Sequence, residues 1–193
     1  MNRSYIFLAP GFEEIEALAT IDILRRGGMD VRSVAIATDG MKEVTGAHGV
    51  MAVADFLPEE LNLSDAEWLI CPGGMPGAQH LSESAFVSEA LRMHYDNGGK
   101  IAAICASPAL VLTPLGLLDG EEATCYPGME PSNPRVKMTG KEVVVLERIV
   151  TANGPATTFK FALAILEKTL GRATAQSVGE GLLFYSTQTT PFN

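Results

Sequence analysis

The first residue of chemical interest is Cys105, which stands between a short apolar run and a helix start. The run Ile101–Ile104 predicts a buried strand, and Ser107-Pro108 are the residue types of a helix N-cap and a first helical position. At such a turn, amide N–H groups and the helix dipole stabilise a thiolate, so we expect a lowered pKa for Cys105. The alternative is that Cys105 is a small buried hydrophobic residue, as most free cysteines are.

Glu16 is the residue best suited to exchange a proton with that sulfur. It lies on the apolar row of a predicted helix, together with Phe12, Ala19 and Ile23. Burial raises the pKa of a carboxyl group and keeps it protonated unless it is paired. A protonated glutamate beside a thiolate can donate a hydrogen bond and later act as general acid or base. Glu13 and Glu14, by contrast, need only complement the positive end of the helix dipole.

The turn Pro72-Gly73-Gly74 follows another apolar run and precedes a helical segment. Glycines allow the backbone to approach a reacting group closely, and their amide N–H groups can bind an oxyanion. The alternative is a plain tight turn, because Pro-Gly-Gly by itself is a weak signal.

The three histidines are possible bases, although each is more often structural than catalytic. His48 stands among glycines and could reach a pocket, and His80 follows the glycine turn and could cap or bind. His94 comes late in a polar helix, so we expect it at the surface. Tyr126 follows Cys125 at the end of a predicted strand and could line the site.

Strand-like and helix-like segments alternate along the chain, which predicts an α/β fold with a mainly parallel sheet and helices on both faces. The sequence predicts strands at Ser4–Ala9, Val31–Ala37, Trp68–Cys71 and Ile101–Ile104, with shorter ones at Ala123–Tyr126, Val136–Met138 and Val143–Leu146. It predicts a hairpin at Val44–Val53 and helices at Glu13–Arg26, Ser84–Tyr95, from Pro108, at Thr157–Leu170 and at Ala173–Phe184. The turns that hold Glu13, Gly73 and Cys105 then meet beyond the carboxyl ends of the strands, where α/β proteins bind ligands.

Composition narrows the classes of function. The 193 residues suit one domain, 1–193, and the net charge of −9 argues against a nucleic-acid partner. No apolar stretch is long enough to cross a bilayer, and the N-terminus has no convincing cleavage site, so we expect no membrane partner. The three cysteines, Cys71, Cys105 and Cys125, lack metal-ligand spacing, which favours a reducing cytoplasm and no metal or other cofactor.

Ordered motifs along nearly the whole chain resemble the ThiJ/PfpI superfamily, most closely the branch of the parkinsonism-associated protein deglycase and its bacterial relatives. The matching strings are Pro10-Gly-Phe-Glu-Glu-Ile-Glu16, Cys71-Pro-Gly-Gly74, Ala102-Ala-Ile-Cys-Ala-Ser-Pro108, Ala123-Thr-Cys-Tyr-Pro127 and Gly154-Pro-Ala-Thr-Thr-Phe159. The resemblance implies a flavodoxin-like three-layer sandwich that forms a homodimer.

The resemblance also implies roles for individual residues. It makes Cys105 the reactive cysteine and Glu16 its acidic partner, with oxyanion-binding amides at Gly74 and Ala106. A family arginine in the hairpin is replaced by His48, whereas Arg26 is retained, so anion binding near the site is expected to differ. With Gly73 and Tyr126, His48 and Arg26 complete the expected pocket.

Two departures from the family pattern shape the expected function. Ala106 stands where the protease-like branch has a histidine, so peptidase activity is not expected; Tyr126 replaces a histidine of the deglycase branch, which leaves Glu16 as proton carrier. We therefore expect a cysteine-dependent enzyme of the glyoxalase or deglycase type, acting on a small reactive carbonyl such as methylglyoxal. The alternatives are an oxidative-stress sensor or chaperone that uses Cys105 oxidation, and a protein related to thiamine (thiazole monophosphate) biosynthesis.

Overall fold

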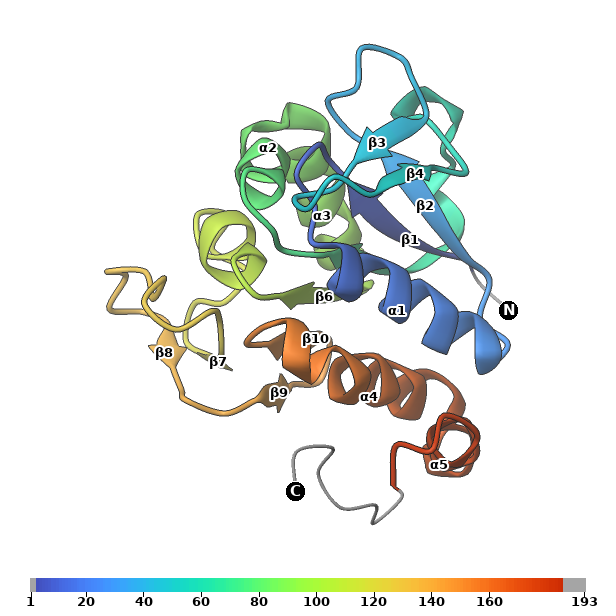
Figure 1. The fold of residues 1–193 in the computed structure, drawn as a ribbon. Helices are drawn as coiled ribbons and strands as arrows, with labels where there is room; N and C mark the ends of the chain where they lie inside the picture. The colour runs from blue at the N-terminus through green and yellow to red at the C-terminus, as the bar shows by residue number, and fades with distance from the viewer. Residues whose placement is uncertain (1–2, 186–193) are drawn as a thin grey trace.

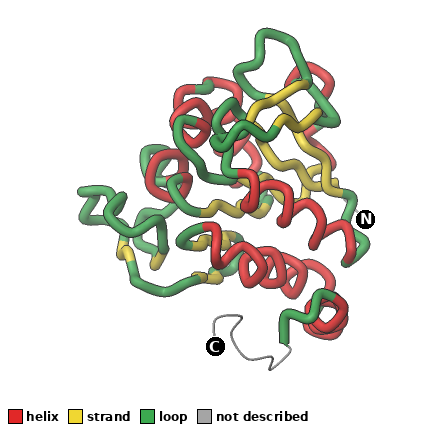
Figure 2. Tube along the Cα trace, in the orientation of Figure 1, coloured by secondary structure: helices red, strands yellow, loops and turns green. Residues whose placement is uncertain are grey.

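The computed structural model describes residues 3–185 (Figures 1 and 2). The strands are β1 (Arg3–Leu8), β2 (Val31–Ala35), β3 (Glu43–Thr45), β4 (Met51–Val53), β5 (Ala66–Cys71), β6 (Lys100–Ile104), β7 (Glu122–Ala123), β8 (Lys137–Met138), β9 (Val143–Val145) and β10 (Ile149–Ala152). The α-helices are α1 (Glu14–Arg26), α2 (Gly77–Glu83), α3 (Ala85–Asp96), α4 (Thr158–Leu170) and α5 (Arg172–Gly181). None of these helices, all within 3–185, combines the length and apolarity needed to cross a bilayer.

A six-stranded sheet in the order β2-β1-β5-β6-β10-β9 forms the centre of the fold. Its strands pair in parallel except for β9, which runs antiparallel to β10 at one edge. Parallel neighbours bring their carboxyl ends to one edge, so the turns after β1, β5 and β6 lie side by side. This edge is where the sequence places Glu16, Gly73 and Cys105.

Helices cover both faces of the sheet, which confirms the predicted α/β sandwich with a mostly parallel sheet. One apolar layer joins alternate strand residues, such as Ile70 and Ile104, to α1 and α4. The intervening residues, such as Leu69 and Ile101, pack with α3 on the opposite face. In Figure 1, α1 and α4 lie in front of the sheet and α3 lies behind it. Burial on both faces explains why these strands are continuous apolar runs instead of alternating patterns.

Several predicted elements differ from the observed ones in length or type. The segment after Cys105 is a π-helical turn, η3 (Pro108–Leu112), where the sequence predicted an ordinary helix. The short helix α2 was missed, because it starts at Gly77 and spans only two turns, too short for a clear apolar period. The predicted strand Ala123–Tyr126 is reduced to the two residues of β7. The rest of that segment turns back toward Cys105, with the Tyr126 N–H donating to the Cys105 carbonyl at 2.8 Å.

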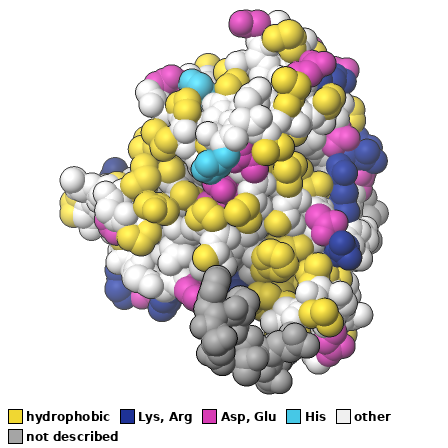
Figure 3. Space-filling model, viewed as in Figure 1, with side chains coloured by type: hydrophobic (Ala, Val, Ile, Leu, Met, Phe, Trp, Pro, Cys, Tyr) yellow, Lys and Arg dark blue, Asp and Glu magenta, His cyan; other side chains and the backbone are white. Residues whose placement is uncertain are grey.

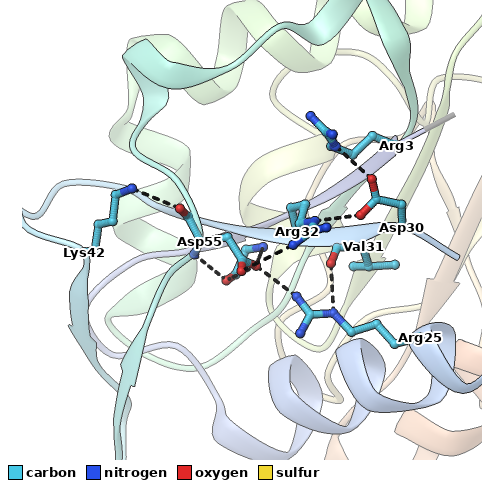
Figure 4. A network of polar contacts seen from close by, with 8 residues as sticks. Arg3, Arg25, Asp30, Val31, Arg32, Lys42 and Asp55 are labelled. Atoms are coloured by element: carbon cyan, nitrogen blue, oxygen red, sulfur yellow. Dashed lines mark hydrogen bonds and ion pairs between the residues drawn. The ribbon is translucent and has the colours of Figure 1, made fainter.

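A polar network fastens the end of α1 to the amino ends of β1 and β2 (Figure 4). The Arg25 guanidinium donates to the Val31 carbonyl at 2.9 Å and to Asp55 at 2.9 Å, and Asp30 accepts from Arg3 and Arg32 at 3.0 and 2.6 Å. Because α1 runs antiparallel to the strands, this network at its C-terminal end leaves its N-terminal end at the edge formed by the carboxyl ends of the strands.

His94 is buried at the amino edge of the sheet, so the prediction that it lies at the surface is wrong. Its Nε2 lies 3.3 Å from the Glu67 carbonyl oxygen and 3.1 Å from that of Lys100, which makes Nε2–H the donor to both strands. A β-carbon at Gly99 would stand 2.2 Å from the ring, so only glycine leaves room for it. The helix pattern hid this role because the partners are backbone carbonyls of other elements.

We expect His94 to make the fold less stable in mild acid. Burial lowers the pKa of His94 below its usual 6.5, so the unfolded chain takes up a proton more readily than the folded one. The contribution of neutral His94 is therefore complete above the unfolded pKa and is lost as pH falls through it. Urea unfolding of the wild type and His94→Gln, compared between pH 7.5 and 5, measures the effect. Parallel pH dependences of the two proteins would contradict it.

Candidate functional site

Cys105 occupies the turn directly after β6 in a backbone conformation that side-chain-bearing residues rarely adopt. Its φ is +64°, in the left-handed region. The conformation is held from both sides: the Cys105 N–H donates to the Ala152 carbonyl at 2.9 Å, and the Cys105 carbonyl accepts from Tyr126. This sharp turn presents the sulfur above the edge of the sheet, as in the nucleophile elbow of hydrolases. The side chain remains 8% exposed, so access is restricted.

Glu16, in the first turn of α1, is fully buried beside that sulfur. Its Oε2 accepts a hydrogen bond of 2.7 Å from the Gly73 N–H. The carboxyl and the Cys105 sulfur both border Gly73, since a β-carbon at that glycine would lie within 3.0 Å of Oε2 and of the sulfur. Oε1 has no hydrogen-bond partner among the described residues, and such a buried oxygen is costly to leave unpaired. The structure thus brings together the two residues that the sequence predicted would exchange a proton.

Gly73 lets the two turns meet. A β-carbon at this position would lie 2.6 Å from Cys105 Cβ, 3.0 Å from its sulfur and 2.8 Å from Glu16 Oε2. The next residue, Gly74, has φ +89°, and a β-carbon there would lie 2.4 Å from the Glu13 nitrogen. Both glycines are therefore required by close backbone approach, which the plain-turn alternative does not demand.

The amides predicted to bind an oxyanion act on the Cys105 sulfur in the expected direction. The backbone N–H groups of Gly74 and Ala106 lower the pKa of the Cys105 thiol, because they favour its charged form. Amide N–H groups that favour negative charge at a reacting atom are the means by which an oxyanion is stabilised.

The prediction of a lowered pKa for Cys105 is wrong. Burial, together with the charge of Glu16, raises the pKa of Cys105 to about 12, and the amides of Gly74 and Ala106 only partly oppose this rise. The same burial raises the pKa of Glu16 to about 7, in the direction the sequence predicted. Near neutral pH the carboxyl is the group that ionises, and the sulfur keeps its proton. The interpretation therefore changes from a resting thiolate to a thiol beside a base.

Glu14 and His48 join the β3–β4 hairpin to the start of α1. The buried Glu14 carboxylate accepts from the backbone N–H of His48 at 2.6 Å and lies 2.7 Å from its Nδ1. The hydrogen bond and the charge of Glu14 raise the pKa of His48. Glu14 is therefore a structural anchor for the hairpin as well as a complement to the helix dipole. The His48 side chain is 72% exposed and belongs to the surface beside the site.

Glu13, Glu14 and His48 are also the residues of this region that could hold a metal ion, since their ligand atoms lie within 4.8 Å of one another. Their hydrogen bonds argue for a structural role instead. Glu13 is the N-cap of α1, and its Oε2 accepts from the Glu16 N–H at 2.7 Å, while Glu14 binds the hairpin. Each carboxylate already accepts a hydrogen bond from a backbone N–H of the protein.

Tyr126, predicted to line the pocket, and His80, considered as a base, both make structural contacts. Tyr126 contacts the site through its backbone, and its ring packs beside Gly154 with 46% of the residue exposed. His80, another histidine considered as a base, points its Nδ1 at the Pro10 carbonyl at 2.8 Å and so holds the turn before α1.

The structure does not bring Arg26 to the site, so its assignment to the pocket is corrected. Arg26 is in the last turn of α1 and pairs with Asp22 of the same helix at 2.7 Å, with about half of each side chain exposed. The helix carries Glu16 at the carboxyl edge of the sheet and Arg26 at the opposite edge, and the length of the helix separates them.

Ser107 has a role that the sequence did not predict. We expected a helix N-cap, but Ser107 already has helical dihedrals and makes no capping bond. Its hydroxyl instead donates to the Pro72 carbonyl at 2.6 Å, across 35 residues of sequence. No local pattern could have indicated this partner.

Comparison with known proteins shows the family to which the chain belongs. The model of the DJ-1/PfpI family matches residues 2–168. Protein dj-1beta of Drosophila melanogaster is 35% identical over 186 residues, covering 95% of this chain and 98% of the relative. The glutathione-independent glyoxalase DJR-1.2 of Caenorhabditis elegans is 34% identical over 170 residues, covering 86% and 88% of the two chains.

Two further comparisons show how much of each protein the similarity covers. Protein DJ-1 homolog A of Arabidopsis thaliana is 36% identical over 178 residues, or 91% of this chain, but the chain spans only 45% of that longer protein. The crystal structure of a DJ-1 superfamily protein of Salmonella typhimurium superposes with a TM-score of 0.89 at 31% identity, covering 94% of this chain and 98% of the other. The fold is therefore shared at nearly full length, as the flavodoxin-like prediction expects.

Proposed function

Because the chain belongs to the DJ-1/PfpI family and sets the Cys105 thiol against the buried Glu16 carboxyl, we propose that it is a cysteine-dependent enzyme for small reactive carbonyls such as methylglyoxal. The observation that carries the proposal is the pairing of a thiol with a carboxyl whose pKa is raised to about 7. Such a carboxyl both accepts and returns a proton near neutral pH.

The first step forms a bond between the sulfur and the aldehyde carbon. The ionised Glu16 removes the proton from the Cys105 thiol as the sulfur attacks, and the aldehyde oxygen becomes the hydroxyl of a hemithioacetal after taking up that proton. The amides of Gly74 and Ala106, which favour negative charge at Cys105, stabilise the negative charge while it is on oxygen.

The second stage moves a proton between two carbons. Glu16 removes the proton from the carbon bonded to sulfur, giving an enediolate, and returns it to the neighbouring carbon. The hydroxyl proton on the sulfur-bearing carbon moves to the neighbouring oxygen, so the former ketone becomes an alcohol and the sulfur-bearing carbon becomes the carbonyl of a thioester. Water then cleaves the thioester, releasing lactate and the Cys105 thiol. Methylglyoxal and water give lactate, so the sequence of steps needs no external oxidant or reductant.

The substrate class rests on two considerations. A thiol adds readily to an aldehyde next to a second carbonyl, and the small exposure of Cys105, 8%, favours a small molecule over a bulky one. The relative from C. elegans bears the name of a glutathione-independent glyoxalase, which supports the same chemistry here. The three cysteines are free and buried, which supports a cytoplasmic location for the enzyme.

An oxidative-stress sensor is the second candidate, and the same pocket supports it. Stepwise oxidation of Cys105 by a peroxide would place oxygens where the amides of Gly74 and Ala106 converge, and protonated Glu16 could donate a hydrogen bond to them. This role requires no turnover, so measured catalysis separates it from the enzyme proposal.

We also propose that the protein is a homodimer that buries an exposed apolar face of α1 and the β3–β4 hairpin. The side chains that form it are Ile15, Leu18, Val50, Met51 and Val53, between 39% and 69% exposed. Figure 3 shows apolar side chains gathered in this region, around a histidine and acidic groups. Apolar clusters of this kind on one face commonly mark protein interfaces.

The dimer proposal predicts the effect of charge on that face. The wild type should elute at about twice the 20.5 kDa mass of one chain, and the double variant Ile15→Asp, Val53→Asp should elute as a monomer, since apposed charges at an interface are strongly unfavourable. Light scattering after size exclusion gives the mass. Met93→Asp, which charges an equally exposed apolar residue on α3, is the matched control and should remain dimeric. A wild type that is monomeric at micromolar concentration would rule the dimer out.

A further inference from the structure

One peptide unit lies between Ser107 and Glu16. The carbonyl of the Pro72–Gly73 peptide accepts from the Ser107 hydroxyl at 2.6 Å, and the N–H of the same peptide donates to Glu16 Oε2 at 2.7 Å. In a planar trans peptide these two groups point in opposite directions. Ser107 and Glu16 therefore hydrogen-bond opposite sides of one peptide.

Both hydrogen bonds are closed to water. Ser107 and Glu16 are each 0% exposed. In such surroundings, a donor at a carbonyl polarises the amide and strengthens its N–H as a donor on the other side. The hydroxyl of Ser107 can thus act on the carboxylate through the intervening peptide without contacting it.

We propose that Ser107 is a positioning residue: through the Pro72–Gly73 peptide it aims the Gly73 N–H at Glu16 and holds the carboxylate beside Cys105. This inference rests on the proposed function for its effect on turnover, but its effect on the Cys105–Glu16 pair stands without turnover. The mechanism as derived from the pair alone gives Ser107 no part.

A purely local role for Ser107 does not fit the geometry. As an N-cap its hydroxyl would accept from an N–H of η3, yet it makes no such bond. It donates instead to the turn after β5, at the point where Gly73 approaches Cys105 most closely. The bond joins the two turns that form the site.

The charged and polar groups around Glu16 indicate how its pKa should change when Ser107 is replaced. The groups that act on it are Cys105 from the end of β6, Glu13 from the start of its own helix, and the Gly73 N–H, which is the strongest influence lowering its pKa. If Gly73 N–H is weakened or displaced, the carboxylate loses that support. The pair should then lose its first proton at a higher pH.

The test is the pH dependence of Cys105 alkylation by iodoacetamide, followed by peptide mass spectrometry, in the wild type, Ser107→Ala and Thr113→Val. In the wild type the rate should rise near pH 7, because ionised Glu16 then takes the proton of the Cys105 thiol as the sulfur attacks. In Ser107→Ala we expect this midpoint to move up by about half a pH unit or more, the effect of losing support for one hydrogen bond to a charge. Turnover of methylglyoxal should fall about tenfold.

Thr113→Val is the matched control. The Thr113 hydroxyl is also buried and also donates to a backbone carbonyl, that of Pro108 at 2.9 Å, but within η3 itself. Its removal should leave the alkylation midpoint unchanged. An Ser107→Ala profile that superimposes on the wild type, or an equal shift in Thr113→Val, would overturn the inference.

The outcomes also separate this inference from the proposed function. A shifted midpoint in a protein that does not convert methylglyoxal supports the inference and rejects the enzyme, whereas turnover with an unshifted midpoint does the reverse. Circular dichroism confirms folding. Should Ser107→Ala not fold, Ser107→Gly removes the same hydroxyl at a position with ordinary helical dihedrals, and the same shift is required of it.

Discussion

Replacement of Cys105 by alanine is expected to abolish lactate formation from methylglyoxal, lowering kcat/KM by at least about a thousandfold. The proposed reaction passes through a carbon–sulfur bond, so no other group in the pocket can replace the thiol. Because position 105 has a φ of +64°, which residues with a side chain rarely adopt, circular dichroism must confirm that the variant folds. The measurement is enzymatic detection of lactate with purified protein.

The other two cysteines provide matched controls. Cys71 is fully buried in β5, where burial raises its pKa to about 12, and Cys125 is buried beyond β7. Cys71→Ala and Cys125→Ala should retain activity within severalfold of the wild type. Lactate at the rate of the protein-free buffer in the wild type itself would reject the enzyme and leave the sensor, for which mild peroxide should add two oxygens selectively to Cys105.

Replacement of Glu16 by glutamine should slow turnover but speed alkylation of Cys105 at high pH. Turnover should fall by at least about a hundredfold, because the amide can neither accept nor return the proton. The pKa of Cys105 should fall from about 12, because the charge of Glu16 is among the causes that raise it. The variant should therefore alkylate faster at high pH while converting substrate more slowly.

This combination distinguishes a proton carrier from a residue that only activates the thiol. Alkylation rates across pH 6 to 11 and lactate formation are measured on the same preparation. Glu13→Gln is the control: it keeps an oxygen for the N-cap bond to the Glu16 N–H and should change neither quantity by more than a few-fold. A Glu16→Gln variant whose turnover equals that of the wild type would show that another group moves the proton.

Much of the fold followed from local patterns. Apolar runs without alternation, such as Ile101–Ile104, are typical of strands covered on both faces, and the observed β6 and α4 lie within a residue of their predicted bounds. The pairing of Cys105 with Glu16 also followed, because parallel strands bring the turns after them to one edge, and the apolar row of α1 faces the sheet.

Other assignments failed where a partner lies far away in the sequence. The sequence neighbours of His94 are those of a polar helix, yet its side chain is buried and hydrogen-bonds carbonyls of β5 and β6. Arg26 matched the family pattern but lies one helix length from the site. Ser107 stands at the position of a helix N-cap, but its hydroxyl donates to the Pro72 carbonyl of a distant turn.

The sequence by itself determined that Glu16, Gly73 and Cys105 meet and which edge of the sheet collects them, because periodicity and turn composition act over a few residues. Only the tertiary structure decided the protonation state of the site. The direction of the Cys105 pKa depends on the balance between burial, the charge of Glu16 and the amides of Gly74 and Ala106. That balance is set by distances of a few ångströms between turns that the chain separates by tens of residues, and no local pattern records it.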